Sequence, residues 1–172
     1  QMNLIFGFAY GNYYSEPNVY MDIDTSGNVY MSSSYTNTMD FDPSQNTHIL
    51  TPQGDYDCYI AKYNTSGSLV WVKTIEGPSS YNWIRDMEII NNRIVILGNY
   101  NNTLDIDPSS AVVALPYGDL TKDNVFSAIY DLNGSLISGT RLYHGDYVKG
   151  HDLLYDQAGN IYTKVFFSDT IV

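Results

Sequence analysis

The sequence is poor in the features that connect a chain to nucleic acid, to a membrane or to a disulfide framework. It holds a single cysteine, Cys58, so no disulfide can form within the chain. Only 8 Lys and Arg stand against 19 Asp and Glu, which gives a net charge of −11, and such a surface repels phosphate backbones and anionic lipid. No apolar run approaches the roughly 20 residues of a membrane-spanning helix. We therefore expect no nucleic-acid partner and no membrane span in this segment.

Aromatic residues are abundant and indicate a folded β protein. The 172 residues include 17 Tyr, and aromatic residues make up 15% of the chain, which excludes a disordered chain because disordered segments are poor in aromatics. A chain of this length buries roughly 70% of its unfolded surface, enough for a real core. No segment keeps a helical period for more than two turns. The run 57–63 has the pattern of a strand, so we expect Cys58 to be a small buried hydrophobic residue.

The strongest signal in the sequence is an internal repeat of about 66 residues. Residues 35–44 match residues 100–109 at seven of ten positions without a gap, and residues 61–70 match residues 128–137. The repeat divides the chain into the last strand of one unit with a linker (1–15), two whole units (16–80 and 81–146) and the first two strands of a further unit (147–172).

Each unit predicts four short strands joined by tight turns. The third strand alternates along the chain and places Tyr59, Ala61 and Tyr63 on one face. Turns rich in Asp, Asn and Gly, such as 24–28 and 64–67, favour hairpins because they supply local side-chain hydrogen bonds and positive φ angles. The predicted strands are 18–23, 29–34, 58–63 and 68–75 in the first whole unit, 84–90, 94–99, 125–130 and 135–142 in the second, and 150–155 and 161–166 in the last.

Four short antiparallel strands at a fixed period are typical of the blades of a β-propeller. We therefore predict an all-β fold made of such blades. A sandwich with a duplicated hairpin pair also fits the strands, but a sandwich does not require sequence repetition. Closed propellers have about 4 to 8 blades, so we expect this segment to be a partial propeller from a longer chain. Its neighbours would be other blades of that chain or partner subunits.

The repeat resembles the SBBP-type β-propeller repeats, which are common in secreted and surface proteins of Bacteroidetes-like bacteria. The similarity rests on Asp-x-x-Gly-Asn-Val-Tyr at 24–30, Asp-Phe-Asp-Pro at 40–43 and Tyr-Ile-Ala-Lys-Tyr-Asn-x-x-Gly-x-Leu-x-Trp at 59–71. It is closest in the first whole unit, and in the second unit Ser138 replaces Trp71. The resemblance implies the propeller fold and an extracellular or cell-surface location.

The repeated Asp-x-Asp-Pro element is the first candidate site, with the pairs Asp40/Asp42 and Asp105/Asp107. In an extended segment, side chains at i and i+2 point to one side about 6 to 7 Å apart. Two such carboxylates would supply part of the about 6 to 8 oxygens that a calcium ion takes. The alternative, which recurrence with the repeat favours, is that each Asp accepts backbone N–H bonds and shapes the loop before the proline. No other cofactor is expected.

Two classes of function fit the sequence, and we expect the first, without a catalytic residue. It is a non-enzymatic scaffold for protein or glycan interaction, in which the Tyr-rich segments 10–14 and 78–83 present aromatic rings with polar tips on loops. The alternative is a carbohydrate-active propeller enzyme, a glycoside hydrolase or lyase, which needs acids that converge in a central channel. The acids on the predicted first strands are Asp22, Asp86, Glu88 and Asp152.

The histidines give no support to a catalytic or metal site. The chain has three of them, and no two occupy a ligand spacing with a nearby acid. They are His48, His144 and His151.

Overall fold

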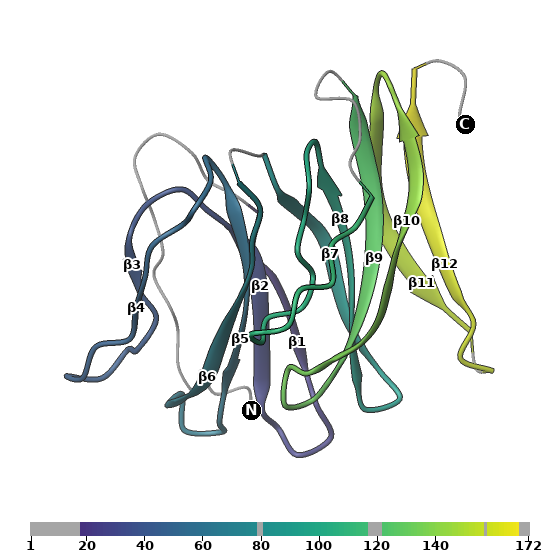
Figure 1. Ribbon diagram of the computed structural model, residues 1–172. Helices are drawn as coiled ribbons and strands as arrows, with labels where there is room; N and C mark the ends of the chain where they lie inside the picture. Colours follow the sequence, from purple (N-terminus) through teal and green to yellow (C-terminus); the bar gives the residue numbers. More distant parts are fainter. Residues whose placement is uncertain (1–17, 79–80, 117–121, 157, 169–172) are drawn as a thin grey trace.

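The computed structural model describes residues 18–78, 81–116, 122–156 and 158–168. Within these residues every regular element is a β-strand (Figure 1). The strands are β1 (Tyr20–Ile23), β2 (Val29–Tyr35), β3 (Met39–Asp40), β4 (Ile49–Leu50), β5 (Asp57–Tyr63), β6 (Leu69–Ile75), β7 (Trp83–Ile90), β8 (Arg93–Tyr100), β9 (Asp123–Asp131), β10 (Leu136–Gly145), β11 (Val148–Tyr155) and β12 (Ile161–Phe167).

The strands form two four-stranded antiparallel sheets, one two-stranded sheet and one small hairpin. The first sheet has the order β1-β2-β5-β6, the second runs β7-β8-β9-β10, and the third is β11-β12. Each sheet lies within one predicted unit, whereas the strand and linker predicted for 1–15 lie outside the described residues. The hairpin β3-β4 was not predicted, because two-residue strands leave no periodic pattern in the sequence.

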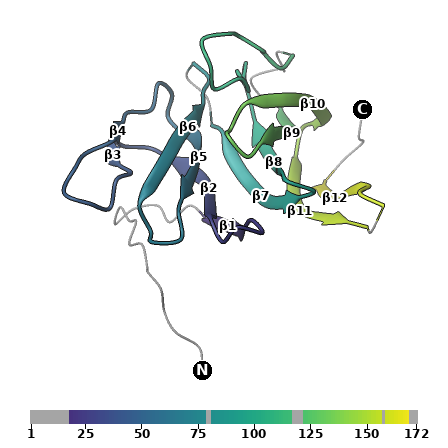
Figure 2. The same cartoon turned by 90° about the horizontal axis from the view of Figure 1, so that it is seen from below.

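The first strands of the three sheets lie side by side. Strand β7 contacts both β1 and β11, while β6 and β10 lie at the far edges of their sheets (Figure 2). The described residues form an open row of sheets and no closed ring. The prediction of an all-β fold with four-stranded antiparallel sheets is confirmed, and the propeller stays a prediction.

The hairpin turns follow the predicted chemistry. Four turns have a glycine with φ between 76° and 85°, a backbone conformation that residues with a Cβ rarely adopt. The turn between β7 and β8 instead uses Asn91 and Asn92, with φ of 49° and 60°, which suits a two-residue type I′ turn. The four glycines are Gly27, Gly67, Gly134 and Gly159.

Asp24 fixes the turn between β1 and β2. Its carboxylate accepts the backbone and side-chain N–H groups of Asn28 at 2.9 and 2.8 Å and the hydroxyl of Tyr30 at 3.1 Å. Burial alone would raise the pKa of Asp24, but the hydrogen bonds outweigh it and lower the pKa below 3.8. Asp156 repeats this arrangement between β11 and β12, where Tyr162 takes the place of Tyr30.

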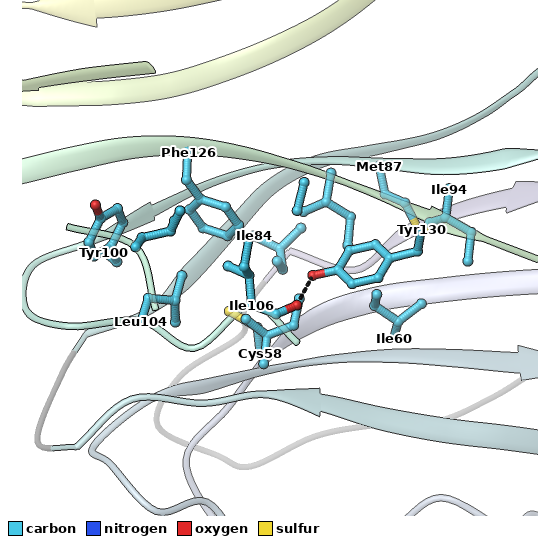
Figure 3. Close-up of a cluster of buried hydrophobic side chains, with 14 of the residues drawn as sticks. Cys58, Ile60, Ile84, Met87, Ile94, Tyr100, Leu104, Ile106, Phe126 and Tyr130 are labelled. Atoms are coloured by element: carbon cyan, nitrogen blue, oxygen red, sulfur yellow. Dashed lines mark hydrogen bonds between the residues drawn. The ribbon is translucent and has the colours of Figure 1, made fainter. Parts of the chain in front are cut away.

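The largest buried cluster lies between the two four-stranded sheets (Figure 3). Cys58 and Ile60 of the first sheet belong to it with Ile94 and Tyr130 of the second. The hydroxyl of Tyr130 donates a hydrogen bond to the carbonyl of Ile106 at 2.9 Å, which ties the long loop of the second sheet to its own strand β9. Cys58 is fully buried, and burial raises the pKa of its thiol to about 12. Its predicted role as a buried hydrophobic residue is confirmed.

Candidate functional site

The carboxylates of the first Asp-x-Asp-Pro loop hold the backbone of their own loop. Asp40 Oδ1 accepts the N–H of Asp42 at 3.0 Å and that of His48 at 2.8 Å. Asp42 Oδ1 accepts the N–H of Ser44 at 2.9 Å. The backbone hydrogen bonds from His48 and Asp42 lower the pKa of Asp40.

The second Asp-x-Asp-Pro loop repeats these contacts. Asp105 Oδ1 accepts the N–H of Asp107 at 3.0 Å and that of Val113 at 2.9 Å, and Asp107 accepts the N–H of Ser109 at 2.9 Å. In both loops the aspartates accept backbone N–H bonds, as expected if their role is to shape the loop before the proline. Calcium binding by these carboxylates stays a prediction.

The residue between the two aspartates anchors each loop in the core. Phe41 is 1% exposed and packs edge-on against Tyr59 with ring centroids 4.7 Å apart. Ile106 is fully buried between the two four-stranded sheets. The backbone of Asp105 also pairs with that of Glu76, the residue directly after β6, at 2.8 and 3.3 Å, so the loop is tied to the first sheet. The aspartates of the two elements are exposed or half-buried, whereas the apolar residue between them is buried.

Removal of calcium is expected to leave the melting temperature unchanged. The oxygens Oδ1 of Asp40 and Asp105 each accept two backbone N–H bonds already, so a bound ion would add little to the stability of either loop. In the described part of the chain, no three His, Cys, Asp or Glu side chains gather in an arrangement that holds a metal ion. Calorimetry with chelator and with excess calcium measures this. A calcium-dependent rise that Asp40→Asn abolishes and Asp55→Asn preserves would contradict the expectation.

The histidines lie on separate elements. His48 is in the β3-β4 hairpin, His144 is on β10 and His151 is on β11. His151 packs edge-on against Phe166, with ring centroids 4.8 Å apart.

Asp22 and Asp86 link the first strands of neighbouring sheets. Asp22 Oδ2 accepts the N–H of Ile89 at 2.6 Å, from β1 to β7, and Asp86 Oδ2 accepts the N–H of Leu153 at 2.6 Å, from β7 to β11. A first strand is the edge of its sheet and presents a row of N–H groups that no strand pairs. The carboxylate of one sheet therefore satisfies a backbone group that the next sheet leaves open. The sequence placed both acids on first strands but did not reveal this role.

Glu88 and Asp152 complete a row of four half-buried carboxyl groups, with Asp22 and Asp86, along the first strands β1, β7 and β11. We call these three strands the inner edge. The strand registers put Glu88 at the place of Asp22 and Asp152 at the place of Asp86, one sheet further on. Burial raises the pKa of Glu88, and the charges of Asp22 and Asp86 raise it further. Burial also raises the pKa of Asp86, with a contribution from Asp152, by more than its two backbone N–H bonds lower it.

This inner edge has two features that acid–base catalysis uses, which are neighbouring carboxyl groups and a raised pKa. Neighbouring carboxyl groups, one of them with a raised pKa, can serve as a proton donor and a base. Asp22 and Asp86 are each held by two backbone N–H bonds. Glu88 and Asp152 accept no backbone N–H from a described residue, so a reaction here would depend on these two.

The substitution Glu88→Gln is expected to stabilise the protein at neutral pH. Because the pKa of Glu88 is higher in the folded protein than its ordinary 4.5, the folded state holds this proton more tightly than the unfolded chain. Its ionisation therefore lowers the free energy of unfolding as pH rises from 4.5 through the raised pKa. Glutamine does not ionise, so it removes this decrease in the free energy of unfolding. Urea unfolding at neutral and mildly acidic pH measures the difference between the variant and the unchanged chain. Equal stability of Glu88→Gln and the unchanged chain at neutral pH would refute the prediction, and Asp55→Asn, an exposed carboxylate, is the control.

A stack of aromatic rings lies at the end of the sheets where one sheet connects to the next. Tyr56 stacks on Trp83 with ring centroids 4.4 Å apart and on Tyr81 at 5.4 Å. The guanidinium of Arg85 lies over the Trp83 ring, 5.5 Å from the ring centroid, and its Nε donates to Asn99 Oδ1 at 3.0 Å. Tyr81 is 48% exposed, so the stack reaches solvent. We call Tyr56, Tyr81, Trp83 and Arg85 the rim stack.

Backbone pairing and one buried carboxylate position the rim stack. The N–H of Asn82 donates to the carbonyl of Tyr56 at 3.2 Å, which sets the two tyrosine-bearing segments side by side. Asp57 is fully buried and accepts hydrogen bonds from the backbone N–H of Gly77 and the side chain of Asn82, each at 3.3 Å. The predicted segment 78–83 therefore contributes rings to an exposed cluster, although residues 79–80 and the other Tyr-rich segment, 10–14, lie outside the described residues.

The next connection between sheets repeats the exposed tyrosine. Tyr147 follows Tyr81 by 66 residues, precedes β11 as Tyr81 precedes β7, and is also 48% exposed. The ammonium of Lys149 lies over its ring at 4.6 Å. An aromatic ring beside a cation thus recurs at the same end of neighbouring sheets.

No protein-family model matches the chain, and no curated protein matches it. Within the described residues no helix is long and apolar enough to cross a membrane.

Proposed function

We propose that this chain is a propeller segment that acts as a non-enzymatic scaffold for protein or glycan interaction through the aromatic rings at the rim of its sheets. The rim stack is the observation that carries the proposal. Rings with polar tips offer apolar area and hydrogen-bonding groups together, which suits both sugars and protein surfaces. The location, outside the cell or on its surface, rests on the resemblance to SBBP-type repeats.

The propeller arrangement is supported by contacts that repeat from sheet to sheet. The carboxylate bridges from Asp22 to Ile89 and from Asp86 to Leu153 start two residues apart in the strand register, and both join successive first strands in the same direction. The long loops enter their sheets with the same hydrogen bonds, Tyr63 to Phe41 at 3.0 Å and Tyr130 to Ile106 at 2.9 Å. A junction that repeats in this way is what a radial array of blades requires.

The test is binding to a panel of immobilised glycans, with Tyr81→Ala as the informative variant. We expect it to weaken binding about three- to tenfold, since one stacked aromatic ring contributes about 0.5 to 1.5 kcal/mol. Tyr155→Ala is the matched control, because Tyr155 is 53% exposed but lies at the opposite end of β11. Binding that Tyr81→Ala leaves intact would contradict a role for the rim stack.

The second candidate function is that of a carbohydrate-active enzyme, and the raised pKa values of Glu88 and Asp86 favour it. Incubation with soluble polysaccharides separates the two candidates. Binding without product release supports the scaffold. Turnover that Glu88→Gln or Asp152→Asn abolishes would support the enzyme instead.

A further inference from the structure

The two outer faces of the row of sheets are exposed where equivalent inner positions are buried. On the free face of β1, Met21 is 57% exposed, whereas Met87 and Leu153, at the same register in β7 and β11, are each 2% exposed. Ile23, also on this face of β1, is 59% exposed. We call Met21 and Ile23 the leading face. Its apolar side chains occupy the positions at which the second and third sheets are buried against the preceding sheet.

The free face of the β11-β12 sheet shows the same contrast. Tyr162 is 54% exposed, whereas Tyr30 and Val95, at the same register in the other two sheets, are 0% and 1% exposed. Leu154, paired with Tyr162 across the hairpin, is 61% exposed, and Phe166 on the same side of β12 is 50% exposed. We call Leu154, Tyr162 and Phe166 the trailing face.

The junctions inside the chain show what covers each face. The trailing side of the first sheet is covered by the leading side of the second, and the trailing side of the second by the leading side of the third. In the first junction the Tyr30 hydroxyl also reaches the carbonyl of Leu132, in the β9-β10 turn, at 3.4 Å. In the second, Asp86 accepts the N–H of Leu153.

We propose that a second copy of this chain docks head to tail, its leading face on the trailing face of the first. The proposal rests on the propeller arrangement put forward above and adds the partner and the residues that meet it. Asp152 stands at the register of Asp86, so its carboxylate accepts the N–H of Met21 in the second copy. Tyr162 stands at the register of Tyr30, so its hydroxyl faces the β5-β6 turn of that copy.

Such a contact joins two different surfaces, so it is heterologous and closes into a ring or continues as a filament. Each copy keeps its rim stack, because Tyr81 and Trp83 lie at the start of β7, in the sheet between the two outer ones. Self-association and ligand binding at the rim are therefore separable.

Sedimentation analysis of the chain and two charged variants tests the docking. Met21→Arg blocks the leading face and Leu154→Arg blocks the trailing face, and both residues are exposed, so each variant is expected to fold. The unchanged chain is expected to associate with rising concentration. Each variant alone is expected to associate about a hundredfold or more weakly, since the arginine would be buried without a partner. Val112→Arg, in an exposed loop with Val112 75% accessible, is the control and is expected to associate normally.

An equimolar mixture of Met21→Arg and Leu154→Arg gives the decisive result. One intact leading face and one intact trailing face remain in the mixture, so the two variants are expected to form a discrete one-to-one dimer. A mixture that stays monomeric, or an unchanged chain that stays monomeric throughout, overturns the proposal. If Tyr81→Ala loses glycan binding but associates normally, the docking proposal is supported. The docking proposal and the rim-binding proposal can therefore fail separately.

Discussion

Replacement of Ile106 by alanine is expected to lower the free energy of unfolding by about 2 to 5 kcal/mol. Ile106 is fully buried in the cluster between the two four-stranded sheets, and its own carbonyl accepts the hydrogen bond from Tyr130. The substitution leaves a cavity at the place where the Asp-x-Asp-Pro element inserts its apolar side chain into this junction. Chemical unfolding monitored by Trp fluorescence measures the loss, and Trp71 at the edge of the same cluster reports on it.

Val112→Ala in the same loop is the control for this prediction. Val112 is 75% exposed, and surface substitutions of this kind change stability by about 0.5 kcal/mol or less. A loss for Ile106→Ala as small as that for Val112→Ala would show that the loop does not anchor the junction. The corresponding change in the first loop, Phe41→Ala, is expected to cost about 3 to 5 kcal/mol, because a larger side chain is removed from an equally buried position.

A methyl group at Gly98 is expected to destabilise the protein by about 1 to 3 kcal/mol or more. A Cβ at this position would lie 2.4 Å from Cε1 of Phe126 and 2.7 Å from the backbone oxygen of Trp83. Phe126 pairs with Gly98 across β8 and β9 and is fully buried, and its rigid ring can move only as a unit. Relief of the contact with the Trp83 oxygen needs a shift of β7. Thermal and urea unfolding of Gly98→Ala give the magnitude.

Gly139→Ala offers a matched comparison in the same sheet. Its Cβ would meet Cδ1 of Ile106 at 2.3 Å, but that atom is the flexible end of a side chain, and the nearest backbone atom, the oxygen of Ser127, is 3.3 Å away. A smaller loss is therefore expected than for Gly98→Ala. The opposite ranking would mean that the β7-β8 pair accommodates the extra methyl more readily than the loop does.

The strands of the three sheets were predictable from local sequence because their signals are local, whereas the two-residue strands β3 and β4 were not. Turn residues such as Asp24 and Gly27 act on backbone within a few positions, and the repeat shows that the same turns recur, so strand order and hairpin pairing follow from the sequence. Cys58 was expected to be buried as a small hydrophobic residue of a strand, and it is fully buried. The Asp-x-Asp-Pro aspartates were identified as recurrent, and their backbone hydrogen bonds are also local.

Contacts between sheets were decided by the tertiary structure alone. The bridge from Asp22 to Ile89 spans 67 residues, and no local pattern tells an aspartate that accepts a distant N–H from one that faces solvent. Tyr56 and Tyr81 meet only because β5 and β7 begin at the same end of adjacent sheets. The sequence by itself determined the strands, the turns and the period at which they recur, since each depends on neighbouring residues. Which carboxylates, rings and apolar side chains meet was settled by the packing of one sheet on the next, because that packing alone brings residues far apart in the chain within hydrogen-bonding and van der Waals distance.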